Sequence, residues 1–162
     1  MNKSTKYSKV LFILHMPPPV HGASMVGKYI HDSKIINNAF ECHYLNLALA
    51  KDLDDIGKGG IRKLKEFYKQ LKQIRKQTKL IVPQLCYVTP NAKGGAFYKD
   101  FFVVMLLKMM RQNIVVHYHN KGIATRQNRY FDNLLYSTFF KNLKVILWIE
   151  NLYQDIKKYV NY

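Results

Sequence analysis

The sequence lacks any apolar run that could cross a membrane as a helix. Its longest uninterrupted apolar stretches, at 101–107 and 10–14, are far shorter than the ~20 residues that a bilayer requires. The amino terminus resembles a secretion signal, because Lys3, Lys6 and Lys9 precede the second of these stretches. That stretch soon ends in a row of prolines, whereas the apolar part of a signal extends over roughly 7–15 residues. We therefore expect a cytoplasmic protein rather than an exported one.

Cysteine and acidic residues are also scarce. Cys42 and Cys86 are the only cysteines and form no CxxC pair, which excludes a disulfide framework and predicts buried free thiols in a reducing compartment. Ten acidic residues against 26 lysines and arginines give a net charge of +16. A chain this basic attracts polyanions, namely nucleic acid, phosphorylated ligands or an anionic lipid surface. The alternative is a basic surface without a specific partner.

The remaining composition is that of one folded domain. Hydrophobic residues make up 48% of the 162 residues and charged residues 22%, as is typical of a globular protein. The length suits a single domain with its own core. The sequence contains no internal repeat, low-complexity tract or linker, so we expect residues 1–162 to form one unit.

Short apolar runs alternate along the chain with longer segments of helical periodicity. Strands are expected at 9–16, 42–47, 85–89, 113–119 and 145–149, and helices at 23–36, 61–79, 96–112, 126–141 and 152–160. Residues 48–60, rich in Asp and Gly, are expected to form a flexible connection. This alternation predicts an α/β domain of Rossmann-like type, with a mostly parallel sheet between two helical layers.

Ligands of open α/β sheets bind beyond the carboxyl ends of the strands, near the switch in strand order. Three segments are expected there, namely the loop 17–24, the stretch His119 to Gly122, and the pair Glu150-Asn151. In the first, three prolines hold the chain extended, and a glycine allows close backbone approach where a helix begins. The N–H groups of Gly22 and Ala23 are therefore candidates for binding a diphosphate. A rigid turn without a ligand is the alternative.

Two nucleotide-binding signatures are missing, the G-x-G-x-x-G fingerprint and the G-x-x-x-x-G-K-[ST] loop. His117 and His119 point to the same face of a predicted strand, a spacing that can chelate a metal. Because no third ligand stands at a recognised spacing, we expect no metal site. We expect His117 to pack near the end of the sheet and His119 to project into the cleft. A purely structural histidine is the alternative.

The helix expected at 61–79 carries a strongly basic face. The residues expected to face a membrane are Lys65, Lys69, Lys72, Arg75 and Lys76. A basic amphipathic helix with Phe67 and Tyr68 at its apolar boundary suits attachment to anionic lipid head groups. The alternative is a solvated outer helix whose apolar stripe packs on the sheet. We expect no nucleic acid as partner, because no RRM, KH or helix-turn-helix signature is present.

Several of these segments together resemble a known family. The first strand and the loop Pro17 to Ser24 look like the start of family 4-like glycosyltransferases from bacterial polysaccharide clusters. The stretch His119 to Gly122 resembles that family's strand-end histidine, and the tail 149–160 is similar to the segment before its interdomain linker. The resemblance spans nearly all of the chain. Gly22-Ala23 stands where many relatives have two glycines, and Trp148-Ile149-Glu150 where the segment often begins with Ser.

The resemblance implies the N-terminal half of a two-domain GT-B enzyme, which moves a sugar from a nucleotide sugar to a lipid-linked or polysaccharide acceptor at the inner face of the cell membrane. It implies that Gly22 and Ala23 approach the donor diphosphate and that His119 contacts the donor sugar as the catalytic residue. The acceptor side would be lined by His21, Ser24, Asn120, Lys121, Gly122 and Asn151.

Such enzymes are generally metal-independent, use no further cofactor and retain the anomeric configuration. Most of the nucleotide-sugar pocket would lie in a C-terminal half outside this chain, so we expect the chain alone to be inactive. The alternative is a non-catalytic, flavodoxin-like module that binds a phosphorylated ligand or an anionic membrane surface.

Overall fold

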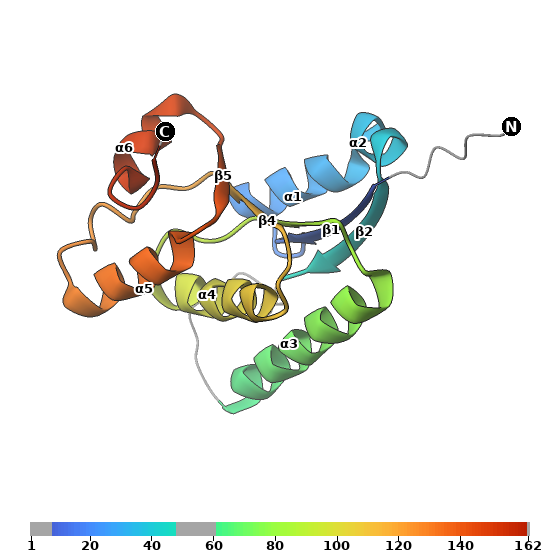
Figure 1. Ribbon diagram of the computed structural model, residues 1–162, viewed down its shortest axis with the longest axis horizontal. Coiled ribbons are helices and arrows are strands. Elements are labelled where there is room, and N and C mark those ends of the chain that lie inside the picture. The colour runs from blue at the N-terminus through green and yellow to red at the C-terminus, as the bar shows by residue number, and fades with distance from the viewer. Residues whose placement is uncertain (1–7, 48–60, 162) are drawn as a thin grey trace, which may run out of the picture.

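A parallel sheet between two groups of helices forms the centre of the molecule (Figure 1). The structure is a computed structural model and describes residues 8–47 and 61–161. The described part confirms the α/β class and the three-layer arrangement expected from the alternating sequence pattern. The connection expected at 48–60 lies outside the described residues.

The described sheet has five strands, β1 (Lys9–Leu14), β2 (Glu41–Asn46), β3 (Leu85–Val88), β4 (Ile114–Tyr118) and β5 (Lys144–Leu147). All neighbouring strands are parallel, in the order β2-β1-β3-β4-β5. The order reverses between β1 and β3, which is the flavodoxin-type arrangement, and ligands of such sheets bind beyond this switch point. The loops after β1 and β3 therefore frame the expected site.

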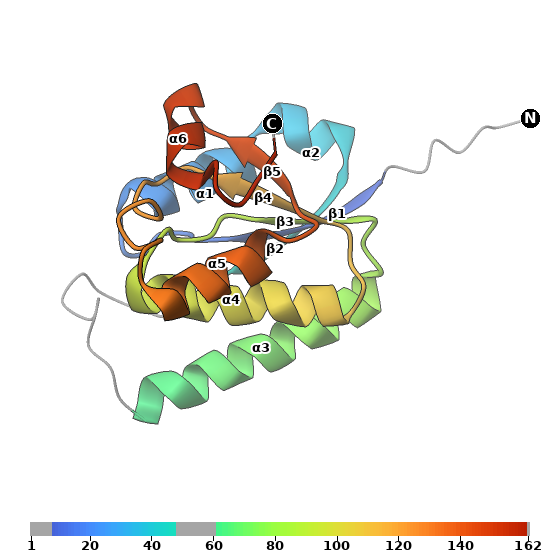
Figure 2. The same ribbon diagram turned by 60° about the vertical axis from the view of Figure 1, so that its left-hand side comes forward.

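The helices divide between the two faces of the sheet. α1 (Gly22–Asp32) and α2 (Lys34–Ala39) cover one face, whereas α3 (Ile61–Ile81), α4 (Gly94–Met109) and α5 (Tyr130–Phe140) cover the other (Figure 2). A short 3-10 turn, η2 (Glu150–Leu152), and α6 (Tyr153–Ile156) follow β5. This division places the basic helix α3 on the outside of one layer, next to α4.

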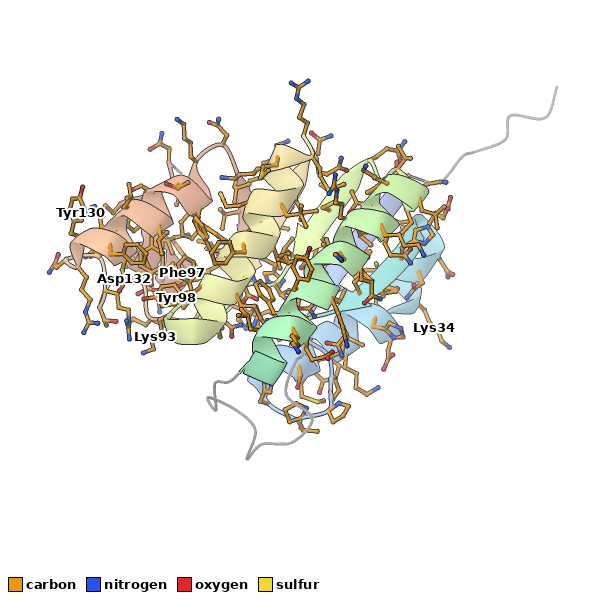
Figure 3. The ribbon with its side chains drawn as sticks, turned by 90° about the horizontal axis from the view of Figure 1, so that it is seen from below. Lys34, Lys93, Phe97, Tyr98, Tyr130 and Asp132 are labelled. Carbon is orange, nitrogen blue, oxygen red and sulfur yellow. The ribbon has the colours of Figure 1, made fainter. Side chains whose placement is uncertain are left out.

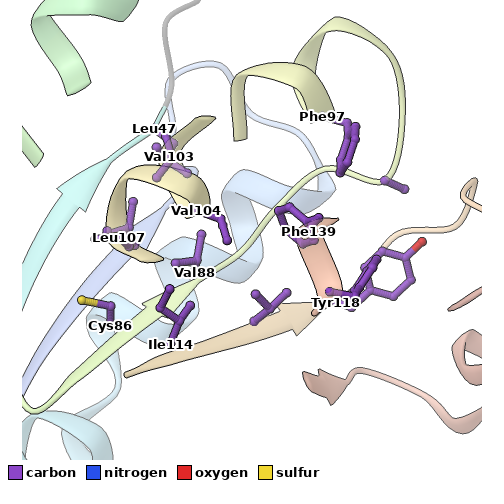
Figure 4. Close-up of a cluster of buried hydrophobic side chains, with 14 of the residues drawn as sticks. Leu47, Cys86, Val88, Phe97, Val103, Val104, Leu107, Ile114, Tyr118 and Phe139 are labelled. Carbon is purple, nitrogen blue, oxygen red and sulfur yellow. The ribbon is translucent and has the colours of Figure 1, made fainter. Parts of the chain in front are cut away.

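Alternation along β1 explains why both faces are covered. Val10, Phe12 and Leu14 form a buried cluster with apolar residues of α1 and α2. Leu11 and Ile13 point the other way, into the larger core that α4 and α5 complete, part of which is shown in Figure 4. Successive strand residues face opposite sides, so a continuous apolar run is required for a strand with helices on both sides.

Several details differ from the expectation. The helix expected at 126–141 begins only at Tyr130, as α5. The helix expected at 23–36 is interrupted at Ser33, whose backbone is extended and whose hydroxyl accepts a hydrogen bond from the N–H of Ile36 to begin α2. The closing helix is reduced to η2 and α6. Each strand ends one or two residues early, so the residues at the carboxyl edge belong to loops.

The two cysteines are unpaired, as expected, but they differ in burial. Cys86 is fully buried, and burial raises the pKa of its thiol to about 12. Cys42 is only half-buried on β2.

Candidate functional site

The loop between β1 and α1 is held by its own hydrogen bonds. The Ser24 hydroxyl accepts from the N–H of His21 at 2.9 Å and donates to the carbonyl of Pro19 at 2.8 Å. In return the Ser24 N–H donates to His21 Nδ1 at 3.3 Å, which completes a capping box at the start of α1. Ser24 is fully buried. The structure therefore places Ser24 inside the loop rather than on the wall of a cleft, contrary to the expectation from the sequence.

The first turn of α1 leaves two backbone donors free. The first N–H groups of a helix have no acceptor within it, and no described residue accepts from Gly22 or Ala23. Gly22 is exposed, and a Cβ built on it would meet no heavy atom within 4 Å. Both N–H groups lie at the positive end of the helix dipole, where anions bind favourably. The diphosphate contact stays a prediction.

A second glycine of α1 fixes how the helix meets the sheet. A Cβ on Gly27 would lie 2.0 Å from the carbonyl oxygen of His15, at the end of β1. No real Cβ approaches a carbonyl so closely, so the backbones of α1 and β1 can pack this way only with glycine at this position. The contact holds the start of α1 close to the switch point.

A buried polar network lies at the switch point. The Nδ2 group of Asn91, which follows β3, donates to Asp100 Oδ2 at 2.7 Å and lies 3.0 Å from His15 Nε2. The Asn91 N–H also donates to Asp100 Oδ2, at 2.8 Å. His15 Nε2 also lies 3.5 Å from Asp100 Oδ2, so the histidine faces both the amide and the carboxylate. His15 and Asp100 are both buried.

The pKa of the Asp100 carboxyl reflects this network. Burial would raise it, but the hydrogen bond and charge of His15 and the nearby Lys99 outweigh burial, so the pKa lies below its usual value. Lys99 itself donates to the carbonyl of Leu47, just after β2, at 2.8 Å. Its pKa is lowered, chiefly by burial. The start of α4 is thus tied to the ends of three neighbouring strands.

His119 lies beside this network. Burial lowers its pKa, and the charges of His15, Asp100 and His21 all act on it, so these side chains lie within electrostatic reach of one another. His119 Nδ1 is 3.3 Å from the carbonyl of His117. If Nδ1 carries the proton and donates, Nε2 is an acceptor, and none of the described residues pairs with it.

His117 packs near the end of the sheet, as expected. It is buried, its Nδ1 is hydrogen-bonded to the hydroxyl of Tyr87, and its ring stacks on that of Trp148. Burial and the neighbouring His119 lower the pKa of His117. His117 on β4 and His119 just after it therefore have different surroundings, the first inside an aromatic cluster and the second at the end of the strand.

The loop after His119 is held in place by a carboxylate of α6. Asp155 of α6 is buried and accepts hydrogen bonds from the N–H groups of Gly122 (2.8 Å), Ile123 (3.0 Å) and Ala124 (3.0 Å), and from the Tyr118 hydroxyl. These bonds outweigh the effect of burial and lower the pKa of Asp155. The carboxylate thus fixes the loop that presents His119.

Gly122 is structural at this point. Its φ of +150° favours glycine, and a Cβ would lie 2.6 Å from the Lys93 side chain. Gly122 is buried, whereas Lys121 beside it is exposed. Of the loop residues expected to line the acceptor side, Asn120 lies with His119, Lys121 points to solvent, and Gly122 shapes the turn.

Unpaired buried atoms gather at this edge of the sheet. Five buried side-chain atoms have no hydrogen-bond partner among the described residues, and four of them belong to Thr89, Asp100, His119 and Asn120. These four residues lie in or just after β3, β4 and the start of α4; the fifth atom belongs to Gln70 of α3. Buried polar groups normally find partners. Apart from the Thr89 hydroxyl, and with the His119 proton on Nδ1, these atoms are acceptors, so a group that donates hydrogen bonds would complement them.

Four residues of this region were missed by sequence reasoning, namely His15, Asn91, Asp100 and Asp155. His15 directly follows β1, and Asn91 lies three residues after the end of β3, so the strand-end rule could have identified both. Asp100 is the only acid in the apolar helix expected at 96–112, and a buried carboxylate needs partners. Asp155 stands in a lysine-rich tail, where no pattern distinguishes it.

Asn151 follows β5, and a cavity lies beside the same strand. Asn151 is exposed in η2. A hollow of about 960 Å³ runs beside the β5 edge, between the end of α5 and the region of α6, with Leu143, Val145, Tyr153 and Tyr159 among its lining residues. None of the residues of the switch-point network lines it.

The basic face of α3 is exposed. Lys65, Lys69, Lys72, Arg75 and Lys76 all point away from the core. Leu64 and Tyr68 are exposed on the same helix, and the Lys72 ammonium lies 4.6 Å from the centre of the Tyr68 ring. Phe67 and Leu71 pack against the core instead. The helix therefore has an apolar inner stripe and a cationic outer face, which fits both interpretations offered above.

In residues 8–47 and 61–161, no three His, Cys, Asp or Glu side chains gather in a way that could hold a metal ion. Within the same ranges, no helix has the length and apolarity needed to cross a membrane. Comparison with family models, curated proteins and solved structures found no match to this chain.

Proposed function

We propose that the chain is the acceptor-side half of a GT-B glycosyltransferase, which moves a sugar from a nucleotide sugar to a lipid-linked or polysaccharide acceptor. The observation that carries this proposal is that free hydrogen-bond donors and unpaired hydrogen-bond acceptors lie at the same edge of the sheet. The free N–H groups of Gly22 and Ala23 suit a phosphate, and the unpaired acceptors of His119 and Asn120 suit sugar hydroxyls. A phosphorylated sugar has both kinds of partner.

In this proposal His119 is the catalytic residue that contacts the donor sugar, and the α1 N-terminus approaches the diphosphate. Electrostatic positioning of the leaving diphosphate would carry much of the rate enhancement, with retention of configuration and without a metal. Most of the groups that stabilise the diphosphate would come from a C-terminal half outside this chain. The resemblance of the loops 17–24 and 119–122 to family 4-like glycosyltransferases supports the same assignment.

NMR of the backbone amides and histidine rings tests the proposal, with inorganic phosphate, glucose and glucose 1-phosphate as probes. We expect phosphate to shift the amides of Gly22 and Ala23 alone, and glucose 1-phosphate to shift these amides together with the His119 ring. His119→Ala should abolish the sugar-dependent gain in affinity and leave phosphate binding intact. Sugar transfer by this chain alone at a normal rate would contradict the proposed division between two halves.

The strand order favours a second candidate, a non-catalytic flavodoxin-like module that holds a phosphorylated ligand at the switch point. The same titration separates the two. If glucose 1-phosphate binds no more tightly than inorganic phosphate and the His119 signal does not move, the module is the better description.

The cationic outer face of α3 supports a location at the inner face of the cell membrane, where anionic head groups attract clustered lysines. Charge reversal at Lys69, Lys72 and Lys76 should weaken binding to anionic vesicles. Reversal at Lys34, Lys157 and Lys158, equally exposed but outside α3, is the matched control. Equal effects of the two triple variants would show that net charge, and not this helix, determines binding.

A further inference from the structure

A second exposed surface lies at the start of α5, on the loop side of the molecule. Tyr130 is 85% exposed, Phe131 63% and Leu134 52%. Spacings of one, three and four residues place the three side chains on one side of the first turn of the helix. Figure 3 shows Tyr130 at the outer end of α5. Contiguous exposed apolar side chains are typical of interaction surfaces.

The cluster is confined to this end of α5. The next residues along the exposed side are Ser137 and Thr138, and the opposite side of the helix buries Tyr136, Phe139 and Phe140 in the core. The apolar surface is thus a tip one turn deep, whereas a continuous stripe would be expected for packing against a long partner helix.

Contacts beneath the tip hold it in place. The Phe131 ring makes an edge contact with Tyr98 of α4, at 6.4 Å between centroids. The Tyr98 hydroxyl donates to Asp132 at 2.7 Å, and Arg126 lies 3.4 Å from the same carboxylate. These residues come from the starts of α4 and α5 and the loop before α5, and Figure 3 shows Tyr98 and Asp132 close to this end.

The charge around the tip is positive. From residue 119 to 134 the sequence has three cations, Lys121, Arg126 and Arg129, and one acid, Asp132. Asp132 is buried and paired, while Lys121 and Arg129 are exposed. Two copies of this surface would bring like charges together, which disfavours self-association. Aromatic and aliphatic side chains surrounded by cations match the interfacial region of an anionic bilayer.

We propose that Tyr130, Phe131 and Leu134 insert into the head-group region of an anionic membrane, with Arg129 contacting lipid phosphates. This proposal rests on the membrane location proposed above, but it concerns different residues. The α3 face would supply long-range attraction through charge, and the α5 tip would supply apolar insertion beside the loop that carries His119. The tip would then orient the strand-end site toward a lipid-linked acceptor.

Vesicle co-sedimentation tests the proposal, with phosphatidylcholine alone and with a 7:3 mixture of phosphatidylcholine and phosphatidylglycerol. We expect Tyr130→Ser combined with Phe131→Ser to lower partitioning into the anionic vesicles at least about tenfold, because two aromatic side chains lose their apolar burial. Arg129→Gln should weaken binding to anionic vesicles only. Met109→Ser is the control, since Met109 is 81% exposed at the far end of α4 and should have no effect.

Insertion depth gives a second measurement. Tyr130→Trp in a Trp148→Phe background should show fluorescence quenching by lipids brominated along the acyl chain. Unchanged partitioning of the double serine variant, or absence of quenching, would overturn the proposal. A third result would also overturn it, namely binding to poly(U) that is tighter than binding to anionic vesicles and is lost in the double serine variant of Tyr130 and Phe131. The tip would then be a nucleic-acid surface.

The experiment separates this inference from the proposed function. Sugar-phosphate titrations report on Gly22, Ala23 and His119, and they give their result without lipid. The α3 charge-reversal variant is measured on the same vesicles, so a tip without effect is distinguished from a protein that does not bind membranes at all.

Discussion

Replacing Asp155 with alanine should destabilise the protein and release the loop that presents His119. The Asp155 carboxylate accepts three backbone N–H groups and the Tyr118 hydroxyl, and it is only 2% exposed. A hydrogen bond to a charged group contributes about 1.5–3 kcal/mol, and a buried donor left unpaired costs about 1–3 kcal/mol. With four such bonds, Asp155 makes more hydrogen bonds than any other described side chain at the carboxyl edge of the sheet.

The expected loss is smaller than the sum of the four bonds. α6 is a single turn of four residues, so it can open and admit water to the freed N–H groups. We therefore expect Asp155→Ala to lower the free energy of unfolding by about 3–5 kcal/mol, a large part of the ~5–15 kcal/mol typical of a domain. Asp155→Asn should cost less, because one amide oxygen can still accept from two of the donors.

Urea unfolding followed by circular dichroism measures the loss, and Tyr118→Phe is the matched control. That variant removes one donor and leaves the three backbone bonds in place, so it should cost about 1–2 kcal/mol. Amide exchange at Gly122, Ile123 and Ala124 should accelerate in Asp155→Ala and stay slow in Tyr118→Phe. A loss below about 1 kcal/mol, the range of ordinary surface substitutions, would refute the idea that this carboxylate anchors the loop.

Other substitutions and the pH dependence give further tests. Gly27→Ala should cost at least about 1–3 kcal/mol in urea unfolding, because its Cβ would overlap the His15 carbonyl; an unchanged midpoint would show that α1 shifts freely. Ser24→Ala should cost about 1–2 kcal/mol through loss of the cap, with Ser137→Ala, an exposed position, as the control. Stability should fall as the pH drops below about 6.5, because the lowered pKa values of His117 and His119 mean that the unfolded chain binds protons first. A second fall should begin below about pH 4, since a carboxyl with a lowered pKa, such as Asp155, stabilises the fold only while ionised. Flat stability between pH 7 and 5 would contradict the first of these assignments.

The layers of the fold were predictable from the spacing of apolar residues along the sequence. The ends and breaks of single elements depend on individual side chains and were not. A strand with helices on both sides needs an uninterrupted apolar run, and Val10 to Leu14 supplies one, so the sheet was predictable. The break at Ser33 was not, because it depends on one hydroxyl capping α2 in competition with continuation of the helix. The strand order was not predictable either, since alternation alone does not specify which neighbour β3 pairs with.

The sequence predicted where the candidate site lies in the fold, but not which hydrogen bonds its residues make. The strand-end rule directed attention to the loops after β1 and β4, which lie at the carboxyl edge of the sheet. It could not show that the Ser24 hydroxyl is used inside its own loop, because a serine at a helix start suits a cap and a ligand equally well. Asp100 and Asp155 are distant in sequence from the residues they hold, so only the folded chain shows that each one fixes a loop at the carboxyl edge.

The residues of the site therefore form two groups, and mutations in the two groups should affect stability differently. Ser24, Asp100 and Asp155 hold the loops through buried hydrogen bonds, so changing them should reduce stability and ligand binding together. The groups proposed to meet the ligand have spare hydrogen-bonding capacity in the folded state, such as the Nε2 atom of His119. Removing the unpaired acceptor relieves a cost that offsets the loss of the contact between His119 Nδ1 and the His117 carbonyl. We therefore expect His119→Ala to change the stability little, while sugar-phosphate binding is lost. A marked loss of stability in His119→Ala would instead make this histidine one more element of the scaffold.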